Sequence, residues 1–181
     1  MVSLPDLLTH YAVSYLIASR SLKPKRALLV ALVGLLPDID ALFRIHRWAT
    51  HSLVLTALVV AIAVLSVSAT RREYLGHVAL LSALYTLHIV MDVFTGPTPI
   101  LWPLSSKEYA VSIGVNGLIS CGGVGMDPYA ELVISDADFT QKPMVNGPVV
   151  SATGVVASIA VAALILAEHF RALSKNRLPN F

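Results

Sequence analysis

Charged residues and cysteines are scarce in this sequence, and both shortages narrow what the protein can be. Only 13% of its 181 residues are charged, whereas soluble domains average roughly 25%. With 56% hydrophobic residues and a mean hydropathy of +0.73, this is the composition of a membrane protein. The single cysteine, Cys121, excludes an internal disulfide and any cysteine-based zinc cluster.

Other signals are also missing. The net charge of +2 is too small to predict a nucleic-acid partner. We find no glycine loop of the kind that cradles phosphate, and no Met or aromatic spacing typical of an organic cofactor site. The N-terminus has no basic region, and Asp6 and His10 interrupt its apolar run, which argues against a cleavable signal.

The apolar residues form five segments, at 7–19, 27–37, 53–69, 75–94 and 149–167. The last three are long enough, at roughly 17–20 residues, to cross a bilayer as helices. The first two are shorter, and we predict that they form a helical hairpin within the bundle.

Residues 95–148 differ in kind, because they are rich in Gly, Pro, Val and Ile and lack a clean helical period. We predict an extracytoplasmic cap here, made of short strands or a re-entrant stretch. The predicted fold is therefore an all-α polytopic membrane protein, with one domain over 1–181, about five helical segments in a bundle and a non-helical or mixed cap.

The basic residues predict an orientation. If the segments alternate in direction, nine cations fall on one side of the membrane: Arg20, Lys23, Lys25, Arg26, Arg71, Arg72, Arg171, Lys175 and Arg177. The other side holds four cations and most of the acidic residues. The positive-inside rule then places the N-terminus outside and the C-terminus in the cytoplasm of a protein integral to the cytoplasmic membrane.

The same alternation gathers the histidines and aspartates that are able to bind a metal. Seven of them fall at the extracytoplasmic end of the bundle: His10, Asp38, Asp40, His46, His51, His88 and Asp92. Imidazoles and carboxylates are costly to bury in apolar surroundings without a partner. A divalent metal centre would explain all of them together.

Two motifs carry the carboxylates. HIVMD places His88 and Asp92 four residues apart, on one face of a helix, where both can bind one ion. The alternative is a hydrogen-bonded pair that bridges helices. In LLPDID, Pro37 is predicted to end the preceding helix, and Asp38 and Asp40 follow it. Two carboxylates that close repel unless a cation joins them. One interpretation is a carboxylate that bridges two metals, and the alternative is a solvated helix end.

The third motif is HRWATHS, which offers His46 and His51 as ligands, or as a ligand and a general acid. Arg47 between them is predicted to hold an anionic substrate group, because its planar fork binds phosphate oxygens in two places.

An alternative account of HRWATHS is a basic interfacial loop, with Trp48 in the aromatic belt and Ser52 or Thr50 capping the next helix. His10, taken alone, is typical of a hydrogen-bonded core histidine. Its interest as a ligand arises because the predicted hairpin returns the chain from His10 toward Asp38.

In combination these motifs resemble the YdjM-like family of inner-membrane proteins, described as metal-dependent hydrolases. That family has an early His, then LLPDIDH, HRGxTHS and HxxxDxxTxxGxxxLxP. Here they appear as His10, LLPDID at 35–40, HRWATHS at 46–52 and HIVMDVFTGPTPILWP at 88–103. Ala41 stands where the family often has His, so one possible ligand is missing. Trp48 replaces the usual Gly and is expected to narrow access to the site.

The donor set and the resemblance together predict a metal-dependent hydrolase. One or two divalent ions would be bound by six residues: His10, Asp38, Asp40, His51, His88 and Asp92. Mixed imidazole and carboxylate ligands favour Zn, with Mn or Fe as alternatives. The ion would activate water against an ester or phosphoester, with His46 as a further ligand or general acid and Arg47 as the anion clamp. The predicted partners are membrane lipids and a lipid-linked or membrane-proximal substrate.

The competing prediction is a non-catalytic membrane protein, either a transporter-like bundle or a metal-stabilised scaffold. A transporter should carry polar residues near mid-membrane and inverted repeats. The segments at 53–69 and 149–167 offer only Ser and Thr there, and we find no repeat. This favours a site at one end of the bundle, and hence an enzyme.

Overall fold

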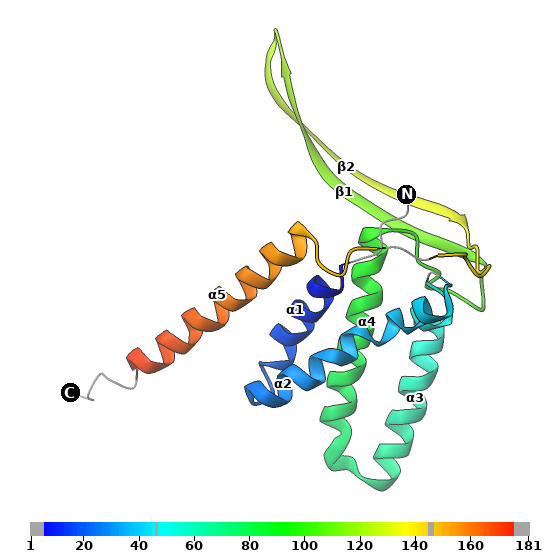
Figure 1. Ribbon diagram of the computed structural model, residues 1–181, viewed down its shortest axis with the longest axis vertical. Coiled ribbons are helices and arrows are strands. Elements are labelled where there is room, and N and C mark those ends of the chain that lie inside the picture. Colours follow the sequence, from blue (N-terminus) through cyan, green and yellow to red (C-terminus); the bar gives the residue numbers. More distant parts are fainter. Residues whose placement is uncertain (1–5, 46, 145–146, 176–181) are drawn as a thin grey trace.

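The protein is mostly helical, with a long β-hairpin at one end of the bundle (Figure 1). The computed structural model describes residues 6–45, 47–144 and 147–175. Within these residues there are five α-helices: α1 (Leu7–Ala18), α2 (Pro24–Ala31), α3 (Leu53–Thr70), α4 (Leu75–Thr95) and α5 (Ala152–Lys175). The same residues include three 3-10 helices, η1 (Leu32–Phe43), η2 (Ala49–His51) and η3 (Arg72–Tyr74), and two strands, β1 (Lys107–Ser120) and β2 (Gly123–Asp136).

Three of the described helical stretches are long and apolar enough to cross a membrane: Leu53–Thr70, Arg72–Thr95 and Ala152–Arg171. They coincide closely with the three predicted spans. Along α3, the side chains of Leu58, Val59 and Leu65 are each more than half exposed. Such a surface suits acyl chains rather than water, and the helix satisfies its own backbone hydrogen bonds, as a lipid-facing segment must.

The first two predicted segments lie together as a helical hairpin, but the second one runs further than predicted. α2 continues directly into η1, so the helix does not end at Pro37. In a 3-10 helix the amide of residue 37 would donate to the carbonyl of residue 34. The helix is of the 3-10 type from Leu32 onward, and because Pro37 has no N–H, the Gly34 carbonyl is left free for another donor.

Gly34 also lets η1 approach α1 closely. A Cβ atom at this position would lie only 1.9 Å from the Ser14 hydroxyl oxygen. Small residues at the contact allow two helices to pack at short range. As a result the start of α1, which carries His10, lies beside the stretch of η1 that carries Asp38 and Asp40.

The predicted cap is a two-stranded antiparallel hairpin, so the chain is not all-α. Fourteen residues pair on each strand, from Lys107 with Asp136 to Ser120 with Gly123. A sequence signal was present: in VSIGVN at 111–116 apolar residues alternate with small or polar ones, which is typical of a strand. The base of the hairpin is joined to the bundle through two backbone hydrogen bonds between Thr98 and Tyr109, of 3.0 and 2.9 Å.

Two caps fix the helix starts nearest the site. Ser52, one of the two residues predicted to cap α3, does so and accepts a hydrogen bond from the Leu55 amide at 3.1 Å. Asp6 caps α1 and also accepts a hydrogen bond from the Ser151 hydroxyl at 2.7 Å, which ties the start of α1 to the start of α5.

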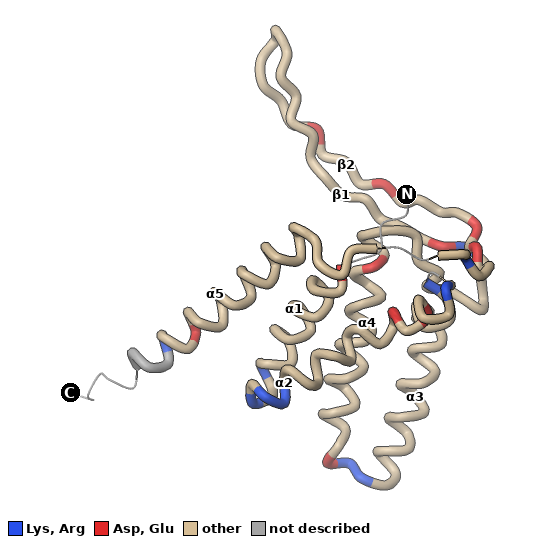
Figure 2. Tube along the Cα trace, in the orientation of Figure 1, with Lys and Arg blue, Asp and Glu red and all other residues tan. Residues whose placement is uncertain are grey.

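The predicted cytoplasmic cations lie away from the end that carries the hairpin. Figure 2 shows cations of this group in the α1–α2 connection and the first turn of α2, in the α3–α4 connection and toward the end of α5, where Arg171 lies. Arg177, which belongs to the same predicted group, lies outside the described residues.

Candidate metal centre

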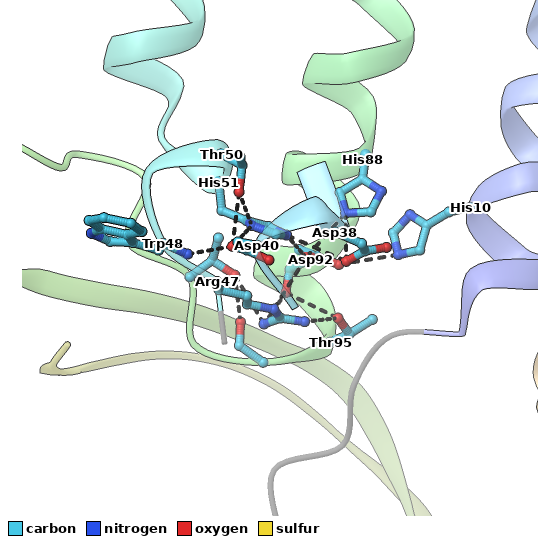
Figure 3. Close-up of polar contacts among 12 residues, drawn as sticks. His10, Asp38, Asp40, Arg47, Trp48, Thr50, His51, His88, Asp92 and Thr95 are labelled. Carbon is cyan, nitrogen blue, oxygen red and sulfur yellow. Dashed lines mark hydrogen bonds and ion pairs between the residues drawn. The ribbon is translucent and has the colours of Figure 1, made fainter. Parts of the chain in front are cut away.

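Four side chains from three elements bring their donor atoms together at the hairpin end of the bundle (Figure 3). Asp38 comes from η1, His51 from the end of η2, and His88 and Asp92 from one face of α4. One donor atom from each residue lies within 4.8 Å of the other three. The side chains of His51, His88 and Asp92 are 0% exposed, whereas that of Asp38 is 18% exposed.

The distances between these atoms match those around a shared cation. His51 Nε2 lies 3.0 Å from Asp92 Oδ2 and 3.7 Å from Asp38 Oδ1. His88 Nε2 lies 3.5 Å from each of the same two oxygens. In a tetrahedral site with bonds of 2.0–2.2 Å, neighbouring donor atoms are about 3.4 Å apart. The four distances between imidazole and carboxylate atoms are therefore close to those of one coordination sphere, and all four donor atoms lie within 4.8 Å of one another.

These contacts do not have the directions of hydrogen bonds. Within the described residues, Nε2 of His51, Nε2 of His88 and both carboxylate oxygens of Asp92 are buried without a hydrogen-bond partner. An N–H···O bond needs near-linear geometry as well as a short distance. Buried polar atoms left unpaired are destabilising. Atoms that converge without pairing with one another indicate a common partner between them, and a cation fits that description.

The outer nitrogen of each histidine is held by a hydrogen-bond partner. His88 Nδ1 lies 2.6 Å from the Gly34 carbonyl oxygen. Because a carbonyl only accepts, Nδ1 carries the proton, and the neutral ring presents a lone pair on Nε2. His51 Nδ1 lies 3.0 Å from Asp40 Oδ2, with the same consequence. The carbonyl that Pro37 leaves free thus orients one of the two imidazoles.

Asp40 was predicted as a ligand, but the structure places it behind His51, outside the group of four. Its Oδ2 also accepts hydrogen bonds from the Trp48 amide at 2.6 Å and from the Thr50 hydroxyl at 2.9 Å. These donors fix the carboxylate against the ring of His51. This position suits orientation of a ligand rather than ligation.

Arg47 was predicted as an anion clamp, but its guanidinium is 97% buried and bound to the protein itself. Nη1 donates to the carbonyl oxygens of Asp92 and Pro97 and to the Thr98 hydroxyl, at 3.1–3.2 Å. Nη2 donates to the Thr95 hydroxyl at 3.0 Å, and Nε lies 3.2 Å from Asp92 Oδ2. With Nη1 and Nη2 hydrogen-bonded in this way, Arg47 holds the turn that follows α4, and its Nε faces the Asp92 carboxylate.

His10 lies at the edge of the cluster. Its Nε2 is 3.2 Å from Asp92 Oδ1, and its ring stacks on that of His88 with 3.9 Å between ring centroids. The predicted hairpin therefore does return the chain to the site, although His10 is outside the group of four donors. His46, the other predicted ligand or general acid, lies outside the described residues.

The pKa values of Asp38 and His51, which lie outside the membrane-spanning helices, reflect how closely these ionisable groups are packed. Burial alone would raise the pKa of Asp38, but His51 and His88 hold it well below its usual range. Burial alone would lower the pKa of His51, but the carboxylates of Asp38, Asp40 and Asp92 raise it to about 10. A proton and a metal ion therefore compete for the same face of His51.

Several supporting residues were not predicted from the sequence. Gly34 acts through a backbone carbonyl, and Tyr85 donates to the Thr50 carbonyl at 2.7 Å, which fixes the short helix that ends in His51. Thr95 and Thr98 hold Arg47. Of these residues, only Thr95 could have been found from the sequence, because the family pattern has a Thr three residues after the Asp that corresponds to Asp92.

Apolar helices of spanning length, with a buried His and Asp cluster at one end, define an integral membrane protein with a centre that could hold a metal ion. The comparison with protein families agrees. The chain matches the family of the YdjM inner membrane protein over residues 1–169, and it belongs to that family. The match includes all four donors and confirms the resemblance seen in the motifs. No curated protein and no solved structure matches the chain.

Proposed function

We propose that this protein is a membrane-bound metal-dependent hydrolase whose centre is formed by Asp38, His51, His88 and Asp92. The observation that carries the proposal is the convergence of four donor atoms, buried or nearly so, that make no hydrogen bonds with one another. Membership of a family of inner membrane proteins supports a site that acts at or near the bilayer.

The donor set suits Zn, with Mn or Fe as alternatives, and the single point of convergence supports one ion. A divalent ion there would lower the pKa of a bound water and polarise an ester or phosphoryl oxygen. In the overall reaction the water oxygen joins the carbonyl carbon or phosphorus, the bond to the alcohol oxygen breaks, and a water proton ends on that oxygen.

The surrounding residues have distinct roles in this proposal. Asp40 and the Gly34 carbonyl orient the two imidazoles. Arg47 and His10 both approach Asp92 and hold its carboxylate in place. Asp38 is the donor that reaches the surface, so the reacting group of the substrate approaches on its side.

We further propose that the centre lies on the extracytoplasmic side and the C-terminus in the cytoplasm. The cations in the connections opposite to the hairpin support this orientation. Cys121, the single cysteine, is exposed in the hairpin turn and provides a native probe. A membrane-impermeant maleimide should label Cys121 in intact cells. A Cys121→Ser variant that carries Glu73→Cys in the α3–α4 connection should be labelled only after lysis, and the reverse pattern would invert the orientation.

The function is tested by loading purified protein with Zn, Mn or Fe and assaying a panel of carboxylic esters and phosphoesters with long and short chains. We expect hydrolysis that depends on the metal and is lost in Asp38→Ala. A metal-loaded, folded protein that turns over none of these compounds would favour the metal-stabilised scaffold instead.

A further inference from the structure

Asp38 opens onto an apolar cavity of about 420 Å³. The cavity lies between the start of α1, the 3-10 helix η1 and the segment that leads into α5. Apart from Asp38, its wall is mainly aliphatic and includes Leu7, Leu32, Leu35, Leu36, Ile39 and Val149. Its size is within the range of pockets that hold small-molecule ligands, roughly 300–1,000 Å³.

The exposure of the donors links this cavity to the metal centre. The side chains of His51, His88 and Asp92 are 0% exposed, and Asp38 is the member of the four that reaches the surface. Asp38 is also one of the residues that line the cavity. A molecule that approaches the centre from the Asp38 side must therefore place part of itself against leucine and isoleucine side chains.

We infer that the cavity binds one acyl chain of a membrane phospholipid, with the ester or phosphoester group of that lipid beside Asp38. Acyl chains are the medium around an apolar bundle, and an apolar wall with one charged residue at its edge matches a molecule that is apolar at one end and polar at the other. The chain enters the cavity from lipid or detergent, which is as apolar as leucine, so its fit against the aliphatic wall, rather than its removal from water, governs binding. The identity of the reacting group rests on the proposed function, whereas binding of the chain does not.

A second apolar cavity provides an internal comparison. It has about 540 Å³ and lies on the other side of η1, against α3 and α4, with none of the four donors in its wall. Leu32 lines the cavity at Asp38, and its neighbour Val33 lines the other one. Substitution of these adjacent residues by tryptophan fills one cavity at a time and leaves the metal donors unchanged.

The test uses the full-length zinc-loaded protein in detergent micelles and a phosphatidylglycerol with a photoreactive group in its acyl chain. Crosslinked residues are mapped by mass spectrometry. We expect labelling of the cavity at Asp38 that falls at least fivefold in Leu32→Trp and stays unchanged in Val33→Trp. Dipalmitoyl phosphatidylglycerol should compete, and glycerophosphoglycerol, which lacks the chains, should not.

Several results would overturn the inference: labelling spread evenly over the lipid-facing helices, labelling insensitive to Leu32→Trp, or competition by a polyprenyl phosphate but not by the phospholipid. Zinc content and hydrolysis are measured on the same samples. Specific labelling without turnover would support the acyl-chain site and contradict the proposed hydrolase activity. Turnover that is equal for short and long substrates, without specific labelling, would contradict the acyl-chain site and support the proposed hydrolase activity.

Discussion

The two ends of the bundle handle charge in opposite ways. At the end with the α3–α4 connection, Arg71 and Glu73 are 70% and 61% exposed, with 3.9 Å between Arg71 Nη1 and Glu73 Oε1. At the hairpin end, His51 and Asp92 are 0% exposed and lie 3.0 Å apart. Exposed charges are solvated separately and contribute little through pairing. Buried charges depend on one another, so removal of one leaves the others uncompensated.

Among the described residues, it is therefore the buried ionisable groups at the hairpin end that need a common partner. A substitution among the buried donors should therefore lower zinc affinity far more than a matched change elsewhere in the chain.

The largest effect is expected for removal of a donor on α4. His88→Ala removes one of the four converging atoms, and we expect zinc affinity to fall more than about 100-fold, beyond the range typical of outer residues. His77→Ala is the matched control, because it changes an exposed histidine of the same helix. Isothermal titration with zinc measures both, and equal affinities for the two variants would contradict the assignment.

A smaller loss of zinc affinity is expected for substitution of Asp40, which lies behind His51. Asp40→Ala removes the carboxylate that orients His51, and outer residues of this kind change metal affinity by about 10–100-fold. Asp136→Ala in the exposed part of the hairpin should leave the zinc affinity at its original value. A loss as large as that of His88→Ala would instead make Asp40 a ligand, as the sequence predicted.

The zinc affinity should also depend on pH. The pKa of His51 is raised to about 10, so below that pH a metal ion must displace a proton from the ring. The affinity therefore falls as the pH falls, by about tenfold per unit for each displaced proton. Asp38 has a lowered pKa and stays ionised throughout the range from pH 8 to 6. Competition titrations with a zinc chelator measure this slope, and a flat profile would contradict the raised pKa.

Pro37→Ala should have a modest effect. The new amide at position 37 competes with His88 Nδ1 for the Gly34 carbonyl, and we expect a loss of zinc affinity of about threefold to tenfold. Pro24→Ala is the control, because Pro24 begins α2, where its missing N–H needs no partner. The same titration applies, and identical affinities would show that the free carbonyl does not depend on proline.

The smallest effect is expected at the opposite end. The double substitution Arg71→Gln and Arg72→Gln changes exposed cations far from the donors, and zinc affinity should stay within about twofold of the original. A large loss would show that the two ends are coupled, and would break the comparison.

The sequence predicted the end of the bundle where the site lies, because the alternation of spans depends only on apolar runs and cations. It also predicted that His88 and Asp92 share a helical face. It did not distinguish ligand from support at Asp40, since spacing does not show which nitrogen of His51 faces the centre. Gly34 acts through a carbonyl, which has no side-chain signature. The continuation past Pro37 was missed because a 3-10 helix tolerates the missing amide.

The hairpin shows a different limit. Its alternating apolar residues at 111–116 were a readable signal, but glycines in both strands weakened it. Arg47 shows a third limit. An arginine between two histidines favours the prediction of a substrate contact, and the sequence does not show that its side chain is buried. The structure buries the guanidinium among the residues that follow α4.

We propose that Asp38, His51, His88 and Asp92 hold one divalent ion. Elemental analysis of the protein, purified without chelators, tests this proposal against the double variant Asp38→Ala and His88→Ala. We expect one transition-metal ion per chain in the unaltered protein and none in the variant, with both still folded by circular dichroism. A folded protein that lacks the metal, or that carries the same amount with and without the two donors, would contradict it.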